Sequence, residues 1–261
     1  MAEECIHGLD AGLCDICFPK ARPVVEVAPT PTRRTPASQP LSRARSKRAI
    51  ALLDAKPVDV GEQRIYHVTH VSNLEAILAA GGLVAGATPI TDISAEAERE
   101  ARRSTPVAGM DGPTVAEFVP FFLSPNASIW DSLRTGTTDS RISPDVAGAE
   151  PAEFVILVST VKAVVESEAN SVVSDGDAAH VLTRFAATPE ANERMLRKLR
   201  KDEDSIVGAE YLVKDAVPFG LVTLVGVAHD KARDRVKAIL KGSEFSPKVS
   251  VYPPWFQSPE A

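Results

Sequence analysis

The sequence predicts an α+β domain, and three observations favour that class. Val-rich apolar segments typical of strands, at 153–161 and 221–228, occur between segments with helical periodicity, without the regular rhythm of a doubly wound sheet. The chain has 261 residues, of which 44% are hydrophobic, enough for one well-packed domain with an appendage. It contains no internal repeat, GxGxxG fingerprint or Walker loop, so the usual dinucleotide and ATP signatures are missing.

The first elements of the domain are predicted from local patterns. Residues 65–68 are typical of a short strand. Ser72 and Glu75 fit a capping box, which predicts that a helix starts there. Gly81 follows the apolar face of that helix and should end it.

The same periodicities predict the remaining elements. These are a polar helix at 94–103, an apolar strand at 119–122, strands at 153–161 and 221–228, and helices at 177–187, 189–201 and 230–240. Between them, Gly and Pro residues are typical of loops.

Composition divides the chain into three parts, which are a Cys/His zinc-binding segment at 1–19, a flexible basic linker at 20–60 and a folded domain at 61–258. The formal net charge is −6, although residues 1–48 hold eight basic and five acidic side chains. A folded domain that binds nucleic acid must therefore use a local groove. The linker itself is either a solubilising tether or a weak attraction to nucleic acid. No stretch has the apolar length of a membrane span and no signal peptide precedes the first cysteine, so we expect a soluble cytoplasmic protein.

All three cysteines lie within the first seventeen residues. With one histidine they supply four ligands of the type that zinc prefers: Cys5, His7, Cys14 and Cys17. A closed set of thiolates and imidazole predicts a structural zinc site, used for docking to nucleic acid or protein. The alternative is a group of free thiols near the chain terminus.

One carboxylate stands inside an apolar strand at 209–213. By alternation, Ala209, Tyr211 and Val213 line one face, while Glu210 shares the other with Leu212. Taken alone, this pattern favours a glutamate at a sheet edge or facing solvent. A buried carboxylate is costly unless it is paired or used in chemistry.

Five blocks together resemble the DarT family of DNA ADP-ribosyltransferase toxins, over about residues 64 to 256. The blocks are 65–83, 118–125, 175–180, 208–218 and 249–256. The resemblance implies a split antiparallel β-sheet core with peripheral helices. It also implies that NAD is a substrate, whose ADP-ribose is transferred to a base of single-stranded DNA, most often thymine, with release of nicotinamide.

The resemblance also implies roles for particular residues. Glu210 matches the catalytic carboxylate, which stabilises an oxocarbenium-like ribose and can take a proton from the attacking base. The family uses an arginine before the 118–125 block to hold the pyrophosphate or to steady the transition state. The candidates are Arg99, Arg102 and Arg103, of which our first choice is Arg103 and our second is Arg102. Asn126 stands where family members often have a basic residue, which leaves the preferred base open.

His67, Thr69 and Asn73 match the family block that contacts NAD. His67 and Thr69 are two residues apart on a strand, so both point the same way and could hold ribose hydroxyls or the nicotinamide amide. Asn73 would lie in the first helical turn, where backbone donors favour phosphate. The alternative is that His67 satisfies a hydrogen bond in the core and that Asn73 is only part of a cap.

The resemblance implies two partners, which are single-stranded DNA and a macrodomain antitoxin of the DarG type. Two other functions stay open at this point. One is an ADP-ribosyltransferase that acts on RNA or protein. The other is a non-enzymatic adapter, in which the zinc segment and basic linker bind a partner and the transferase domain is degenerate.

Overall fold

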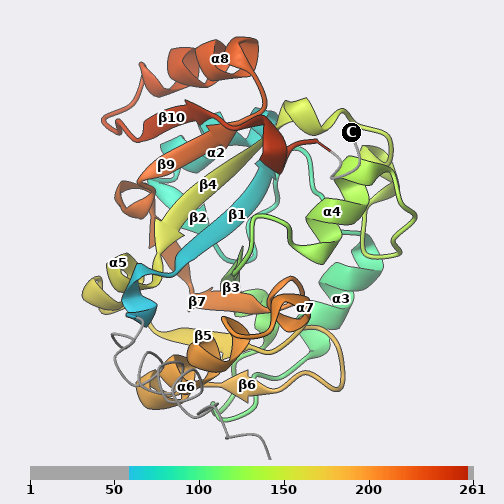
Figure 1. The fold of residues 1–261 in the computed structure, drawn as a ribbon, viewed down its shortest axis with the longest axis vertical. Coiled ribbons are helices and arrows are strands. Elements are labelled where there is room, and N and C mark those ends of the chain that lie inside the picture. Colours follow the sequence, from blue (N-terminus) through green and yellow to red (C-terminus); the bar gives the residue numbers. More distant parts are fainter. Residues whose placement is uncertain (1–58, 258–261) are drawn as a thin grey trace, which may run out of the picture. The chain divides into compact units, whose positions relative to one another are not determined.

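One sheet of eight strands organises the described part of this computed structural model, residues 59–257 (Figure 1). Its strand order is β10-β9-β4-β1-β3-β7-β5-β6, and all neighbours are antiparallel except the parallel pair β10 and β9. The bounds are β1 Arg64–His70, β3 Phe118–Phe122, β4 Phe154–Thr160, β5 Ser171–Ser174, β6 Phe185–Ala186, β7 Glu210–Lys214, β9 Leu224–Val227 and β10 Lys248–Val251. A second, two-stranded sheet pairs β2 (Gly82–Val84) with β8 (Ala216–Pro218).

The helices lie around this sheet. Their bounds are α2 Leu74–Ala79, α3 Glu96–Ser104, α4 Ser128–Thr135, α5 Val161–Glu166, α6 Pro189–Leu199, α7 Glu203–Ile206 and α8 Asp230–Leu240. Figure 1 shows α8 beside β10 at one edge of the sheet and α6 beside β5 and β6 at the other. The mostly antiparallel sheet with its separate helices confirms the predicted mixed class of strands and helices.

The sheet consists of two halves that meet at β1 and β3. β1 pairs with β4 along its whole length, whereas it pairs with β3 only at Tyr66 and Phe122. Beyond that pair, Gln63 uses its side-chain Nε2 to donate to the Leu123 carbonyl at 3.0 Å. The strands therefore diverge on either side of one backbone contact, and polar side chains cross the gap.

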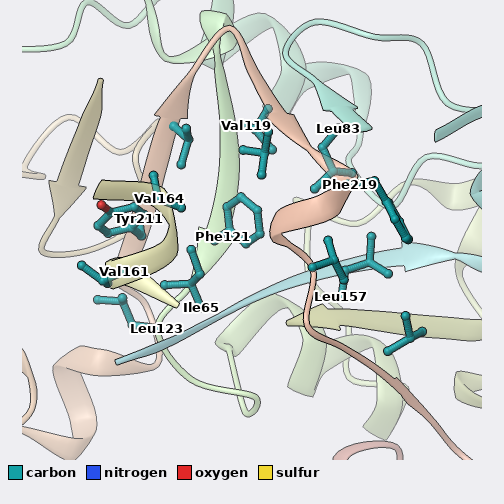
Figure 2. Close-up of a cluster of buried hydrophobic side chains, with 14 of the residues drawn as sticks. Ile65, Leu83, Val119, Phe121, Leu123, Leu157, Val161, Val164, Tyr211 and Phe219 are labelled. Carbon is teal, nitrogen blue, oxygen red and sulfur yellow. The ribbon is translucent and has the colours of Figure 1, made fainter. Parts of the chain in front are cut away.

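Both halves contribute to one hydrophobic core. Figure 2 shows Ile65 of β1, Phe121 of β3, Leu157 of β4 and Tyr211 of β7 within this cluster. Each of these side chains is at most 1% exposed. Burial of one large apolar side chain contributes about 1.5–3 kcal/mol, so the shared core holds the halves together where backbone pairing does not.

The predicted capping box at the start of the first helix is wrong. A 3₁₀ turn at Val71–Asn73 precedes α2, and the imidazole of His70 caps it by accepting from the Ser72 amide at 3.2 Å. The Ser72 hydroxyl is engaged with His70 and Thr91 instead. A histidine was thus a stronger local acceptor than the serine that the pattern favoured.

The predicted helix at 177–187 is also wrong. These residues form turns followed by the short strand β6. The Asp177 carboxylate accepts from the Ala179 amide at 3.0 Å, and the Asp177 carbonyl accepts from the Thr183 hydroxyl at 2.6 Å. An aspartate that bonds to nearby backbone competes with helix formation, which explains the error. The other predicted elements are confirmed, with bounds shifted by a few residues.

Candidate active site

Glu210 is the first residue of β7 and lies where the two halves of the sheet join. Ala209, Tyr211 and Val213 lie on one face of the strand, as alternation predicted, and belong to the shared core. Glu210 points to the opposite face and is paired across the sheet with Phe122, the same residue that joins β3 to β1. The residue is only 2% exposed, and β7 lies between β3 and β5, so the edge or solvent-facing position that the strand pattern alone favoured is wrong. The strand therefore places a carboxylate inside the protein, at the junction itself.

The two oxygens of this carboxylate have different surroundings. Oε1 accepts from Nη2 of Arg102 at 2.6 Å and from the Ala178 amide at 3.0 Å. Oε2 is buried and has no hydrogen-bond partner among residues 59–257. The Glu210 amide is held as well, since it donates to the hydroxyl of Ser174 at 3.1 Å. A buried oxygen without a donor is costly, and an acceptor with this cost is typical of a site that receives a proton or a positive charge.

Arg102 of α3 brings the positive charge to Glu210. Its side chain is 17% exposed, and Nε donates to Oε1 of Glu98 at 3.0 Å. Asp177 lies at 3.9 Å from Nη2. Burial by itself would lower the pKa of the Arg102 guanidinium, but the carboxylates of Glu210, Asp177 and Glu98 together outweigh burial and leave this pKa raised. Arg102 is therefore a permanent cation at the base of the site.

Arg103, the first choice among the arginines, lies elsewhere. Its side chain is 49% exposed and pairs with Glu96 and Glu100 on the outer face of α3. Arg99 pairs with Asp92 at 2.7 Å, ahead of the helix. The structure thus brings Arg102 to Glu210, and it does not bring Arg103 there.

His67 lies on β1, beside the gap between the halves. Its Nδ1 is 2.9 Å from the carbonyl oxygen of Pro120 on β3. A carbonyl can only accept, so Nδ1 carries the proton and Nε2 is an acceptor. Burial lowers the pKa of His67, and the bond to Pro120 opposes this effect only in part. The imidazole is therefore neutral and can accept a hydrogen bond from a ligand hydroxyl.

Thr69 and Asn73 contact each other behind this position. The Asn73 amide nitrogen donates to the Thr69 hydroxyl at 3.0 Å and to the Thr91 carbonyl at 2.7 Å. Its oxygen accepts from the Thr91 amide at 2.9 Å. Both amide hydrogens of Asn73 are thus used within the protein, where they fix the segment that leads into α3.

Sequence reasoning gave no role to several charged residues of this network, among them Glu98, Asp177 and Arg141. Asp177 lies in the quoted 175–180 block but received no role. The Arg141 guanidinium pairs with Asp177 at 3.1 Å and with Asp139 at 2.6 Å. The hydrogen bond from Arg141 to Asp139 holds the pKa of that carboxyl at about 2, well below its ordinary value. Nothing in the local sequence singles out Arg141, because Asp177, its link to this network, is 36 residues away.

The predicted zinc ligands Cys5, His7, Cys14 and Cys17 lie outside the described residues, so the zinc site stays a prediction. Within residues 59–257, no group of three or more His, Cys, Asp or Glu side chains could hold a metal ion. None of the helices in that range combines the length and apolar character that a membrane span requires.

Comparison with known proteins gives a consistent result. The model of the family described as "ssDNA thymidine ADP-ribosyltransferase, DarT" matches residues 66–257. A DNA ADP-ribosyl transferase of Thermus aquaticus is 28% identical over 189 residues, which cover 67% of this chain and 80% of the relative.

Solved structures of related proteins share the fold. DarT of Thermus sp. 2.9 in complex with ADP-ribosylated ssDNA superimposes with a TM-score of 0.64 at 23% identity, covering 75% of this chain and 96% of that one. Its complex with NAD⁺ gives a TM-score of 0.62. DarTG of Thermosipho africanus in complex with ADP-ribose gives 0.57 at 18% identity, covering 74% of this chain and 51% of that one. The family match extends over most of the chain, and the protein therefore belongs to the DarT family of ssDNA thymidine ADP-ribosyltransferases.

Proposed function

We propose that this protein transfers ADP-ribose from NAD to a base of single-stranded DNA, with thymine as the acceptor that the family description names. The Thermus relative with the same fold has been captured with NAD⁺ and with ADP-ribosylated ssDNA. The observation that carries the proposal is the carboxylate of Glu210, buried where the sheet halves join, with Oε1 held in place and Oε2 without a partner among the described residues.

Glu210 takes part in two steps of the proposed reaction, which are cleavage of the bond to nicotinamide and attack by the base. The glycosidic bond between the ribose and nicotinamide breaks, and nicotinamide leaves with the bonding electrons. The ribose carbon becomes oxocarbenium-like, and a buried carboxylate stabilises that charge more strongly than one in water. N3 of thymine carries the ring's N–H and bonds to the ribose carbon, while its proton passes to Oε2 of Glu210.

Three other side chains have proposed roles. Arg102 holds Glu210 in place and presents its remaining N–H groups to the diphosphate of NAD or to the transition state, which we assign to it in preference to Arg103. His67 accepts from a sugar hydroxyl through Nε2. Thr69 faces the same side as His67, and Asn73 supports both by fixing the segment at Thr91.

A labelled-NAD assay with oligonucleotides of each base tests the proposal. Wild-type protein should label the thymine oligonucleotide, and Glu210→Gln should reduce the rate about a thousandfold. The substitution keeps the shape of the side chain, so circular dichroism should remain unchanged. Label on RNA or protein but on no DNA would replace the proposed acceptor. Retained activity in Glu210→Gln would remove Glu210 from the mechanism.

We also propose that the enzyme acts as a toxin with a macrodomain antitoxin of the DarG type. The name of the Thermosipho relative, DarTG, and its complex with ADP-ribose support a pairing of this kind. Expression of the wild-type chain should arrest growth and modify cellular DNA, and co-expression of an ADP-ribose-removing macrodomain should relieve both. Arrest by Glu210→Gln would contradict the toxin role.

A further inference from the structure

Helix α3 carries three glutamates, and only one of them points into the protein. The Glu98 side chain is 11% exposed, whereas Glu96 and Glu100 are 69% and 66% exposed. Glu98 lies one turn before Arg102, and the spacing of four residues places both side chains on the same face of the helix. The buried face of α3 therefore presents a glutamate and an arginine together.

Two bonds at different atoms orient the guanidinium of Arg102. Nε donates to Glu98 at 3.0 Å, and Nη2 donates to Glu210 at 2.6 Å. Because the guanidinium is planar, a bond at Nε fixes the rotation about the end of the side chain and hence the direction of Nη2. We propose that Glu98 is a positioning residue, which holds Arg102 in the orientation that aligns Glu210 for transfer; this inference rests on the proposed function.

Glu98 adds a carboxylate to a cluster that already has an excess of negative charge, so its contribution to stability does not explain its position. Asp177 and Glu210 also face Arg102, so one guanidinium meets three carboxylates. Arg141 lies beyond Asp177 and is shared with Asp139. Acidic groups thus outnumber basic ones in this partly buried cluster, and a third carboxylate adds repulsion.

The titration of Glu98 agrees with this imbalance. Burial raises the pKa of Glu98, and the nearby Asp177 carboxylate raises it further, which the attraction of Arg102 offsets only in part. A carboxyl with a raised pKa stabilises the fold at low pH and loses that contribution as the pH rises through the raised value. At neutral pH the ionised form of Glu98 therefore costs stability, so a neutral side chain of the same shape should not lower the melting temperature.

The variant Glu98→Gln separates a positioning role from a stabilising one. Glu100→Gln is the matched control, because Glu100 accepts from Nε of Arg103 at 2.9 Å on the exposed face of the same helix. In the labelled-NAD assay, Glu98→Gln should lower kcat about tenfold or more, because small misplacements of a catalytic group reduce rates strongly. At an assay pH of about 7.5, the melting temperature of Glu98→Gln should equal or exceed that of the wild type. Glu100→Gln should leave both unchanged.

The pH profile gives a second readout. Burial and the nearby Asp177 carboxylate raise the pKa of Glu98, so its carboxylate takes up a proton, and loosens its hold on Arg102, at a higher pH than an ordinary glutamate would. Glu98→Gln should therefore move the acid limb of kcat to lower pH, which Glu100→Gln should not do.

Each outcome for Glu98→Gln decides the matter. Unchanged kcat and acid limb would overturn the positioning role, and so would a variant that unfolds or melts well below the wild type, because Glu98 would then be a structural anchor. A wild-type protein that transfers no ADP-ribose would instead refute the proposed function, so the two failures are distinguishable.

Discussion

Arg102 and Arg103 are adjacent in sequence and make the same kind of bonds. Each donates from Nε to a glutamate of its own helix, at 3.0 Å for Arg102 and 2.9 Å for Arg103. Each also donates from Nη2 to a second glutamate, at 2.6 Å and 2.5 Å respectively. By bond lengths alone, the two arginines are nearly indistinguishable.

They differ in what surrounds the bonds. The carboxylates of Arg102 belong to Glu98 and Glu210, with side chains 11% and 3% exposed. Those of Arg103 belong to Glu96 and Glu100, whose charges water and salt screen. Charge pairs act more strongly in the low dielectric of the interior, and removal of one partner there leaves the other uncompensated. Burial thus separates the ion pair that we propose to be functional from a solvated one.

Of the two arginines, Arg102 should show the larger effect, and Arg102→Lys tests it. Lysine keeps the charge but replaces the planar fork with a single ammonium, which cannot bond Glu98 and Glu210 in the same geometry. We expect kcat for ADP-ribose transfer to fall about a hundredfold or more. Steady-state kinetics with labelled NAD measure it, with circular dichroism as the check on folding. A variant with wild-type kcat would show that charge alone suffices at this position.

The sequence could not have separated the two arginines. Residues 96–103 read as a charged helix with acidic and basic side chains on several faces, and α3 has no fully buried residue to mark its inner face. The side of α3 that turns inward is set by contacts with Glu210 and Asp177, which lie 108 and 75 residues away from Arg102 in the chain. Local periodicity contains no information about such partners.

By contrast, Glu210 was singled out in advance, but by the resemblance to the DarT family, because the strand pattern taken alone favoured an edge or solvent-facing glutamate. Alternation correctly placed Ala209, Tyr211 and Val213 on one face of β7, and the structure buries that face in the shared core. The prediction of a helix at 177–187 failed for the opposite reason, because Asp177 bonds to its own turn and so overrides the helical pattern. The two faces of the strand were predictable from its alternation, whereas the burial of Glu210 and the turns around Asp177 depend on neighbouring strands and loops and were not.

A smaller effect is expected at Asn73, which fixes the approach to α3. Asn73→Ala removes three hydrogen bonds and leaves the backbone of Thr91 unpaired, which should lower the free energy of unfolding by about 2–3 kcal/mol. It should also raise KM for NAD, because the segment before Arg102 loosens. Denaturation curves and kinetics on the same samples measure both.

Asn192→Ala is the matched control for Asn73. Asn192 is also a buried amide that bonds backbone groups, at Ser171 and Val173, but it lies on α6. Asn192→Ala should lower the free energy of unfolding by a similar amount without a change in KM for NAD. An equal rise of KM in both variants would mean that lost stability, and no specific link to the site, explains the result.

The smallest effect is expected from Arg103→Lys and Arg103→Ala. Both partners of Arg103 are exposed, so loss of these two ion pairs should leave kcat within about twofold of the wild type. An exposed arginine one residue after Arg102 could still contact a phosphate of the DNA substrate. That role would appear as weaker oligonucleotide binding and a salt dependence reduced by about one charge, with kcat unchanged. A loss of kcat comparable to that of Arg102→Lys would instead show that α3 turns when substrate binds, since only a rotated helix could bring Arg103 to Glu210.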